Sequence, residues 1–179
     1  MKQYELLKKR SVLFSQGMSL KEIEETERIY SIVFPREIKR AYMFALPISH
    51  GFYNWRERKE EYVNHVKKVI NRPLIELVED ADYIDWNETW GEELYGDEKK
   101  EYIKRRMKLA PKLIPVFSHR YAISGDMNES PVFSINGSDI ICYGKNYLQY
   151  LEIEFGQRSI KEIRSENSYY ASLWSELAM

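Results

Sequence analysis

Residues 113–144, LIPVFSHRYAISGDMNESPVFSINGSDIICYG, decide the fold of this chain. Two apolar runs within them, 131–135 and 139–143, flank an Asn-Gly pair at 136–137, with one serine between this pair and the second run. Asn-Gly accepts positive φ at both central positions of a turn, as the type I′ turn of a β-hairpin requires. The stretch therefore predicts an antiparallel hairpin.

A third apolar run, 113–117, predicts another strand in the same sheet. Pro115 should lie at an edge or at a break in the ladder, because proline has no N–H to donate. The polar composition of 122–130 predicts a loop between this region and the hairpin. The second hairpin strand carries apolar residues on both faces, among them Ile140 and Ile141, so helices should cover at least one face.

Helices are predicted around this sheet, because apolar residues recur there at intervals of three or four. Ser19 and Glu22 form a capping-box pattern at the start of one helix, and Ser159 and Glu162 form another. Asn71 and Pro73 should stop the third helix, and a strand is predicted directly after it, over 74–78. The predicted helices cover residues 19–30, 35–45, 56–70, 99–109, 147–155 and 159–177.

These elements predict an α+β fold, with a small, mainly antiparallel sheet over 113–143 wrapped by five or six helices. The chain has 179 residues, 44% of them hydrophobic, which suits one domain with a sizeable core. The apolar positions on the inward stripes should form that core. They are Ile23, Tyr30, Ile38, Val66, Val116, Phe133, Ile140 and Leu151.

Four motifs, in order along the chain, resemble those of the SUKH superfamily, the group related to the fungal Smi/Knr cell-wall regulators. The first is the opening SLKEIEETERIYSIVFPREIKRAYMFALPI, and the second is FYNWR at 52–56. WNETWG follows at 86–91, and then HRY, a polar loop, PVFSINGSDIICYG and the helix NYLQYLEIEF. The similarity covers residues 18–155. The chain departs from the family pattern at Cys142, where an aromatic residue is usual, and at Ala122-Ile123, which replace a step that commonly contains proline.

The resemblance implies one SUKH-like domain over residues 1–179, with 1–17 and 157–179 as additions. Bacterial members of the superfamily are largely immunity proteins that bind toxin domains, many of them nucleases. The resemblance therefore implies an immunity (antitoxin) protein that neutralises a basic nuclease toxin by occlusion and performs no chemistry. A regulatory protein-interaction role, as in other members, is the first alternative, and a small hydrolase is a distant one.

The residues themselves give no support for catalysis. His119, Asp139 and Ser118 or Ser138 could form a nucleophilic triad on paper, but the spacing matches no known order and a G-x-S-x-G elbow is missing. Cys142 lies in an apolar strand, where a thiol is usually inert. The sequence therefore predicts no catalytic residue, and the chain is expected not to be an enzyme.

Ligand-binding motifs are also lacking. Histidines 50, 65 and 119 do not have metal-ligand spacing, and Asp80, Asp82 and Asp85 do not fit the EF-hand loop. The chain has no P-loop and no dinucleotide fingerprint. Its basic residues are spread over helices at a net charge of −1, which argues against direct nucleic-acid binding. We expect no metal and no cofactor.

The single cysteine excludes an intramolecular disulfide and fits a reducing compartment. The N-terminal residues lack the apolar run of a signal peptide, and nothing approaches a membrane span. We therefore expect a soluble, cytoplasmic protein that does not bind membranes. The sequence does not predict its oligomeric state.

An acidic, aromatic segment is the one strong functional signal. Residues 74–98 contain ten acidic residues and no lysine or arginine. One interpretation is a solvated loop whose tryptophans pack into the core. The other is a protein-binding surface, in which fixed negative charge steers a basic partner and aromatic rings supply contact area. The candidate partner-binding residues are Asp80, Asp82, Tyr83, Asp85, Trp86, Glu88 and Trp90, with Arg120 and Tyr121 beside the hairpin as a second choice.

Overall fold

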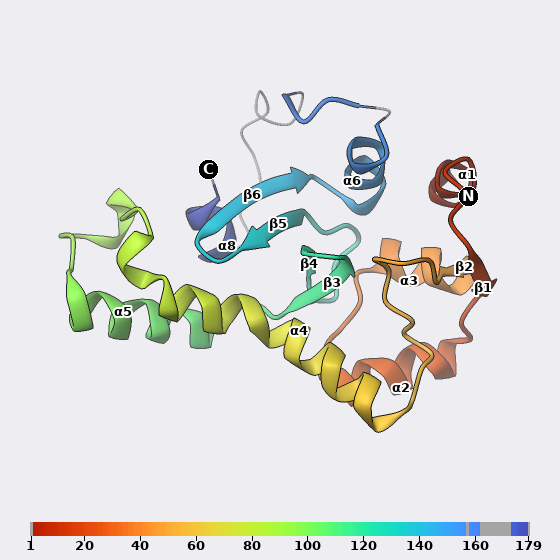
Figure 1. Cartoon of the computed structure of the whole chain (residues 1–179), viewed down its shortest axis with the longest axis horizontal. Coiled ribbons are helices and arrows are strands. Elements are labelled where there is room, and N and C mark those ends of the chain that lie inside the picture. The colour runs from red at the N-terminus through yellow and green to blue at the C-terminus, as the bar shows by residue number, and fades with distance from the viewer. Residues whose placement is uncertain (1, 157, 162–172, 179) are drawn as a thin grey trace.

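The computed structural model describes residues 2–156, 158–161 and 173–178, which adopt an α+β fold (Figure 1). The predicted fold class is confirmed. The first half of the chain contains α1 (Lys2–Lys8), β1 (Phe14–Gln16), α2 (Leu20–Tyr30), α3 (Arg36–Phe44), β2 (Ala45–Pro47), α4 (Glu60–Glu79) and the 3-10 turns η1 (Ala81–Tyr83) and η2 (Glu88–Trp90). The second half contains α5 (Gly96–Leu109), β3 (Leu113–Phe117), β4 (Arg120–Ile123), β5 (Val132–Asn136), β6 (Asp139–Gly144), α6 (Tyr147–Glu154) and α8 (Leu173–Leu177).

Strands β3 to β6 form an antiparallel sheet in sequence order, and β5 and β6 are the predicted hairpin. Asn136 pairs with Asp139, so Gly137 and Ser138 are the two turn residues. Gly137 has φ 60°, whereas Ser138 is not among the residues with positive φ. The turn therefore follows the type II′ pattern, with glycine at its first central position. The type I′ turn predicted with Asn136 and Gly137 at its centre is wrong, because the central pair lies one residue further along the chain. Pro115 lies in the edge strand β3, beside a register irregularity, as proline requires.

Strand β4 includes Ala122 and Ile123, which the sequence placed in a loop. The strand pairs with β3 on one side and with β5 on the other. Its side chains alternate between the two faces of the sheet, with Tyr121 and Ile123 on one face and Ala122 on the other, and all three are buried. Four residues are too few for this alternation to be recognised among the polar residues around them.

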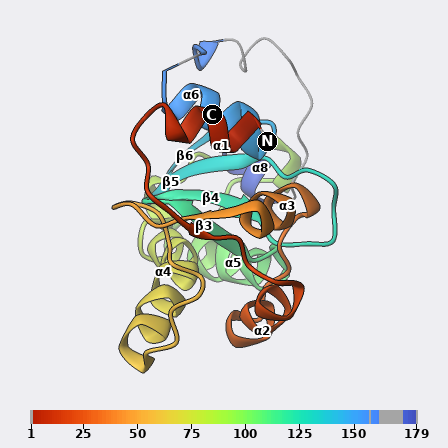
Figure 2. The same ribbon diagram turned by 90° about the vertical axis from the view of Figure 1, so that its right-hand side faces the viewer.

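The pleat of the sheet divides the core into two clusters. Ile114, Val116, Ala122 and Val132 pack in one cluster with α1, α2, α3 and α6. The residues that alternate with them pack in the other cluster with η2, α5 and α8, and α4 contributes side chains to both. In Figure 1, α4 runs below the sheet from the end near α2 to the end near α5, and Figure 2 shows α6 and α1 on the opposite side. All eight predicted core residues are buried.

Helix α2 begins with the predicted capping box, in which Ser19 and Glu22 satisfy each other's free backbone N–H groups. Ile23 and Tyr30 are buried on its inner stripe, but Leu20 is 55% exposed and does not belong to that stripe. Glu162 of the second predicted capping box and most of the terminal helix lie outside the described residues, so this capping box stays a prediction. In the described part of this terminal segment, Trp174 of α8 is fully buried.

Helix α4 continues through Pro73 to Glu79, so both the predicted stop and the predicted strand over 74–78 are wrong. A proline inside a helix leaves the carbonyl four residues earlier without its N–H donor. In α4 that carbonyl belongs to Val69, and the hydroxyl of Tyr121 donates to it at 3.3 Å. The proline is therefore tolerated because a strand residue supplies the missing donor.

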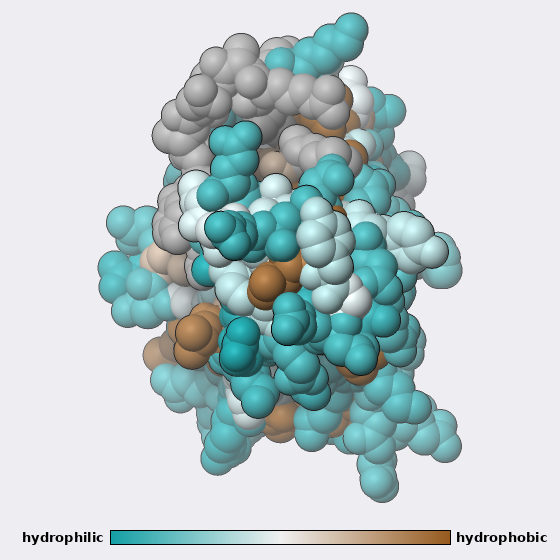
Figure 3. Space-filling view, turned by 90° about the vertical axis from the view of Figure 1, so that its left-hand side faces the viewer, coloured by the Kyte–Doolittle hydropathy of each residue, from teal (hydrophilic) through white to brown (hydrophobic). Residues whose placement is uncertain are grey.

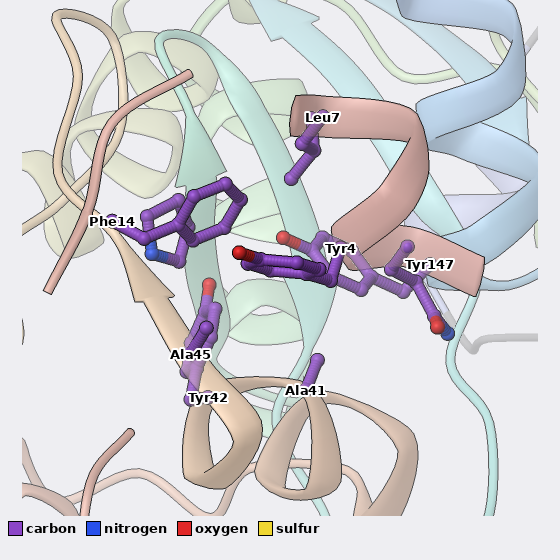
Figure 4. Close-up of a pocket in the computed structure, with 9 residues that line it drawn as sticks. Tyr4, Leu7, Phe14, Ala41, Tyr42, Ala45 and Tyr147 are labelled. Carbon is purple, nitrogen blue, oxygen red and sulfur yellow. The ribbon is translucent and has the colours of Figure 1, made fainter. Parts of the chain in front are cut away.

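The N-terminal helix α1 packs on α3 and α6. Figure 4 shows Tyr4 and Leu7 of α1 among Phe14, Tyr42 and Tyr147, and the ring centroids of Tyr4 and Phe14 lie 4.8 Å apart. The space left between these side chains is only about 10 Å³, barely enough for one water molecule. This contact is part of the core and cannot hold a ligand.

Glu37 of α3 is buried, with 5% of its surface exposed. Its carboxylate accepts hydrogen bonds from the backbone N–H of Ser130 at 2.8 Å and from that of Tyr147, the first residue of α6, at 3.1 Å. Burial raises the pKa of Glu37 to about 7, although these two hydrogen bonds oppose the increase. One side chain thus joins α3 to the segment before β5 and to the start of α6.

The raised pKa of Glu37 predicts a pH-dependent stability. Between its ordinary value of 4.5 and about 7, the folded protein binds the proton more tightly than the unfolded chain does. The contribution of Glu37 to the free energy of unfolding should therefore decrease as the pH rises through this range, by about 3 kcal/mol in total. Urea unfolding at several pH values should show wild type losing stability relative to Glu37→Gln, whose amide oxygen can still accept both hydrogen bonds. Glu24→Gln, an exposed change in α2, is the control, and parallel stability curves for wild type and Glu37→Gln would contradict the assignment.

The proline in α4 gives a second prediction. Tyr121→Phe should leave the Val69 carbonyl without a donor and cost about 1–3 kcal/mol in urea unfolding. In a Pro73→Ala background the restored N–H of residue 73 can donate to that carbonyl, so the same change should cost less. A double-mutant cycle measures this coupling. Equal costs in the two backgrounds would show that the tyrosine hydroxyl does not compensate for the proline.

Candidate functional site

The acidic end, defined here as residues 80–98, is folded against the core. It leaves the end of α4 through η1 and η2 and enters the first turn of α5. Ala81, Ile84 and Trp90 are buried, and the acidic residues between them point outward. Because buried anchors recur every few residues, the charged side chains project from a fixed backbone.

Two tryptophans and a tyrosine form the base of the acidic end. The ring centroids of Trp86 and Trp90 lie 5.3 Å apart, and Tyr102 of α5 lies 5.0 Å from Trp86 and 5.8 Å from Trp90. Trp90 is 8% exposed, its indole N–H donates to the Glu176 carboxylate at 2.6 Å, and the Arg106 guanidinium lies over its ring. Trp90 therefore offers a partner little surface, although the sequence analysis counted it among the partner-binding residues. Trp86 is half-buried.

Lys99, in the first turns of α5, secures the same segment from below. Its ammonium group is buried and donates to the carbonyl of Ile84 at 2.7 Å, and the Glu93 carboxylate lies 3.9 Å away. A buried ammonium is tolerated only where it is paired or hydrogen-bonded. Its bond to the loop therefore holds the end of η1 against α5.

The exposed surface of the acidic end combines carboxylates with two tyrosines. Asp82, Asp85 and Glu88 are exposed, as predicted, and Tyr83 is 80% exposed. Tyr95 is 70% exposed and was not predicted, although it lies within the same acidic stretch. Figure 3 looks at this end of the molecule, where hydrophilic and pale residues cover most of the surface. Lys100 pairs with Asp82 at 3.2 Å, whereas Asp85 and Glu88 have no ion pair among the described residues.

The fold brings the hairpin turn and the C-terminal residues beside the acidic end. Between them lies a hollow of about 380 Å³. Asp80, half-buried at the end of α4, faces the turn so closely that a Cβ on Gly137 would collide with its carboxylate. The residues that line the hollow are Tyr83, Ile84, Asp85, Trp86, Asn87, Ser138, Asp139, Glu176, Leu177 and Ala178.

The second-choice contact site is not available as predicted. Tyr121 is fully buried, and its hydroxyl is used by Val69. Arg120 pairs with Glu154 at 2.9 Å, its side chain is only 12% exposed, and its guanidinium lies 4.3 Å from the centroid of the Tyr143 ring. Both residues support the sheet, so the structure contradicts Tyr121 as a contact residue and leaves Arg120 little free surface.

The candidate triad is not assembled. The Ser118 hydroxyl lies 3.3 Å from Nδ1 of His119, but Nε2 of that ring contacts the Arg120 guanidinium, whereas a triad has a carboxylate beside the second nitrogen. Burial lowers the pKa of His119, and the neighbouring Arg120 lowers it further. Burial also raises the pKa of the Cys142 thiol, which disfavours the thiolate. Among the described residues, His, Cys, Asp and Glu side chains do not form a group of three that could hold a metal ion.

The helices in the described part of the chain are all too short or too polar to cross a membrane. A scan against protein-family models and searches of curated proteins and solved structures found no match. We therefore infer function from the geometry and charge of the acidic end and from the motifs in the sequence.

The contact between Lys99 and Ile84 can be tested directly. Lys99→Met should free the acidic end from α5, because a charged hydrogen bond is lost, and should cost about 1–3 kcal/mol. Amide hydrogen exchange over residues 80–93 should become faster. Lys100→Met is the matched control, since its exposed pair with Asp82 should be worth about 0–1 kcal/mol. Equal effects of the two changes would contradict the anchoring role of Lys99.

Proposed function

We propose that this protein is a non-catalytic immunity protein whose acidic end binds a basic protein partner and blocks its active surface. The observation that carries the proposal is the composition of that end: unpaired carboxylates and two exposed tyrosine rings on a rigid aromatic base. The SUKH-like motifs in the sequence support the same function. A partner of this kind is a nuclease toxin domain.

The charge of the acidic end suits such a partner. Nucleases hold the phosphate backbone with lysine and arginine, so their active surface is basic. A surface that carries Asp85, Glu88 and Glu92 accelerates the encounter with a basic protein and disfavours acidic ones. Occlusion of the toxin's substrate groove then requires only a stable complex.

The exposed tyrosines supply the short-range part of the interaction. Tyr83 and Tyr95 are among the most exposed large side chains of the described residues. Tyrosine is enriched at interface hot spots, and its ring also accepts the cationic groups of arginine and lysine. Because Trp86, Trp90 and Lys99 already hold the segment, little conformational entropy remains to be lost on binding.

A regulatory protein-interaction role would use the same surface without a toxin, and it remains the alternative. In both cases the chain acts in the cytoplasm, where its single cysteine, Cys142, stays reduced. A pull-down of this protein with the product of the neighbouring gene, followed by co-expression of the two, would separate the alternatives. Rescue of cells that express the neighbouring product would support immunity over regulation.

Charge reversal at the acidic end should slow association. We expect Asp85→Lys, Glu88→Lys and Glu92→Lys together to reduce the on-rate of the captured partner, with a smaller change in the off-rate. Binding of the wild type should weaken as salt is added, because exposed charges are screened beyond about 8 Å at physiological ionic strength. Tyr83→Ala should raise the off-rate instead. Surface plasmon resonance measures both rates.

The matched control reverses three exposed glutamates elsewhere, Glu5→Lys, Glu24→Lys and Glu61→Lys, which change the net charge by the same amount. These changes should affect the on-rate less than the reversal at the acidic end. Equal effects of the two triple variants would contradict a specific acidic interface. Turnover of a substrate by the purified protein, lost on His119→Ala, would contradict the whole proposal.

A further inference from the structure

A second hollow, of about 330 Å³, lies on the other side of the hairpin turn. Asn136, at the end of β5, lines this hollow, whereas Ser138 and Asp139 line the hollow of the acidic end. Its opposite wall is one stripe of α4, and the remaining sides come from the turn between β3 and β4 and the loop after β2. Its polar lining consists of Tyr53, His65, Arg72, Ser118, His119 and Asn136.

The chemistry of this lining is opposite to that of the acidic end. Every polar residue in it can donate a hydrogen bond, and none is a carboxylate. The Tyr53 hydroxyl is already used, because it donates to the carbonyl of Ser118 at 2.8 Å. Both ring nitrogens of His119 are used as well, because Nε2 faces the Arg120 guanidinium and Nδ1 faces the Ser118 hydroxyl. The side chains of Arg72, His65, Ser118 and Asn136 thus remain to meet a ligand rich in acceptor oxygens.

Arg72 has donor capacity left. Its Nη2 donates to the Tyr121 hydroxyl at 3.3 Å, and this is the one hydrogen bond that its guanidinium makes among the described residues. Its Nε is buried without a hydrogen-bond partner, and the nearest carboxylate oxygen, from Glu76, lies 3.5 Å away. A planar guanidinium with free N–H groups is well suited to an oxyanion.

The surroundings of the hollow contain charges of both signs. Arg120 lies behind His119, and its charge and that of Arg72 help to lower the pKa of that ring. Glu76 pairs with Arg72 and also accepts from the N–H of Gly137, so its charge is partly compensated. Asp139 does not line the hollow, although its charge tends to raise the pKa of His119.

We propose that this hollow is a phosphate-binding site, with Arg72 as its main anion ligand, His65, Ser118 and Asn136 as further donors, and the His119 ring as part of its wall. The ligand is a free phosphate ion or the phosphate group of a small solute such as a nucleotide. The site is independent of the acidic end, since it takes a ligand of the opposite charge through other side chains.

Nuclear magnetic resonance titration tests the site on the full chain. The probes are inorganic phosphate and adenosine monophosphate, each added at constant ionic strength against sodium chloride. We expect saturable shifts of the ring signals of His65 and His119. Tighter binding of the nucleotide would identify an organic phosphate as the ligand, and equal affinities would identify the phosphate ion itself.

Two variants and a control decide the outcome. Arg72→Gln should weaken phosphate binding at least about tenfold, because charge-assisted hydrogen bonds are lost. Arg105→Gln removes the same charge from an exposed position of α5 and should change the affinity little. Asn136→Asp places a carboxylate in the lining, on an exposed strand end that tolerates it, and should also weaken binding even if Arg72→Gln fails to fold. Unsaturable shifts with both probes, or equal losses in Arg72→Gln and Arg105→Gln, would overturn the proposal.

Discussion

The buried carboxylate of Glu37 joins parts of the chain that are about a hundred residues apart. It accepts N–H groups from Ser130, at the entrance to β5, and from Tyr147, at the start of α6. An anion at a helix N-terminus is favoured by the helix dipole, which offsets part of the cost of burying the charge. The contact holds α3 to the segment before β5 and to the start of α6, a helix that packs with α3 in the first core cluster.

Several side chains with apparent functional chemistry turn out to serve the framework. Tyr121 supplies the donor that Pro73 takes away from α4, and Trp90 packs below the acidic end with its N–H on Glu176. Arg120 is held by Glu154 and Tyr143. The long helix α4 can therefore run from the first core cluster to the second, and it presents Arg72 to one hollow and Asp80 to the hairpin turn.

The hairpin turn separates two surfaces with opposite chemistry. On one side, carboxylates and exposed tyrosines suit a basic protein. On the other side, a lining without carboxylates suits an oxyanion. The two-residue turn places Asn136 and Asp139 opposite each other. Asn136, at the end of β5, lines the second hollow, and Asp139, at the start of β6, lines the hollow of the acidic end. Because the two hollows are lined by different side chains, each can be tested by side-chain changes that leave the hairpin intact.

Periodicity and local motifs in the sequence determined the α+β class, the β5–β6 hairpin, the capping box of α2 and all eight predicted core residues, because each of these depends on neighbours a few positions away. Local signals also identified the acidic stretch as charged. They could not show that α4 passes through Pro73, since the compensating hydroxyl comes from a strand 48 residues later in the chain. Nor could they show which aromatic rings of the acidic end are exposed, because packing against α5 and α8 buries Trp90 and leaves Tyr83 and Tyr95 outside. The tertiary structure alone decided these points, because burial and hydrogen-bond partners depend on segments that are distant in sequence.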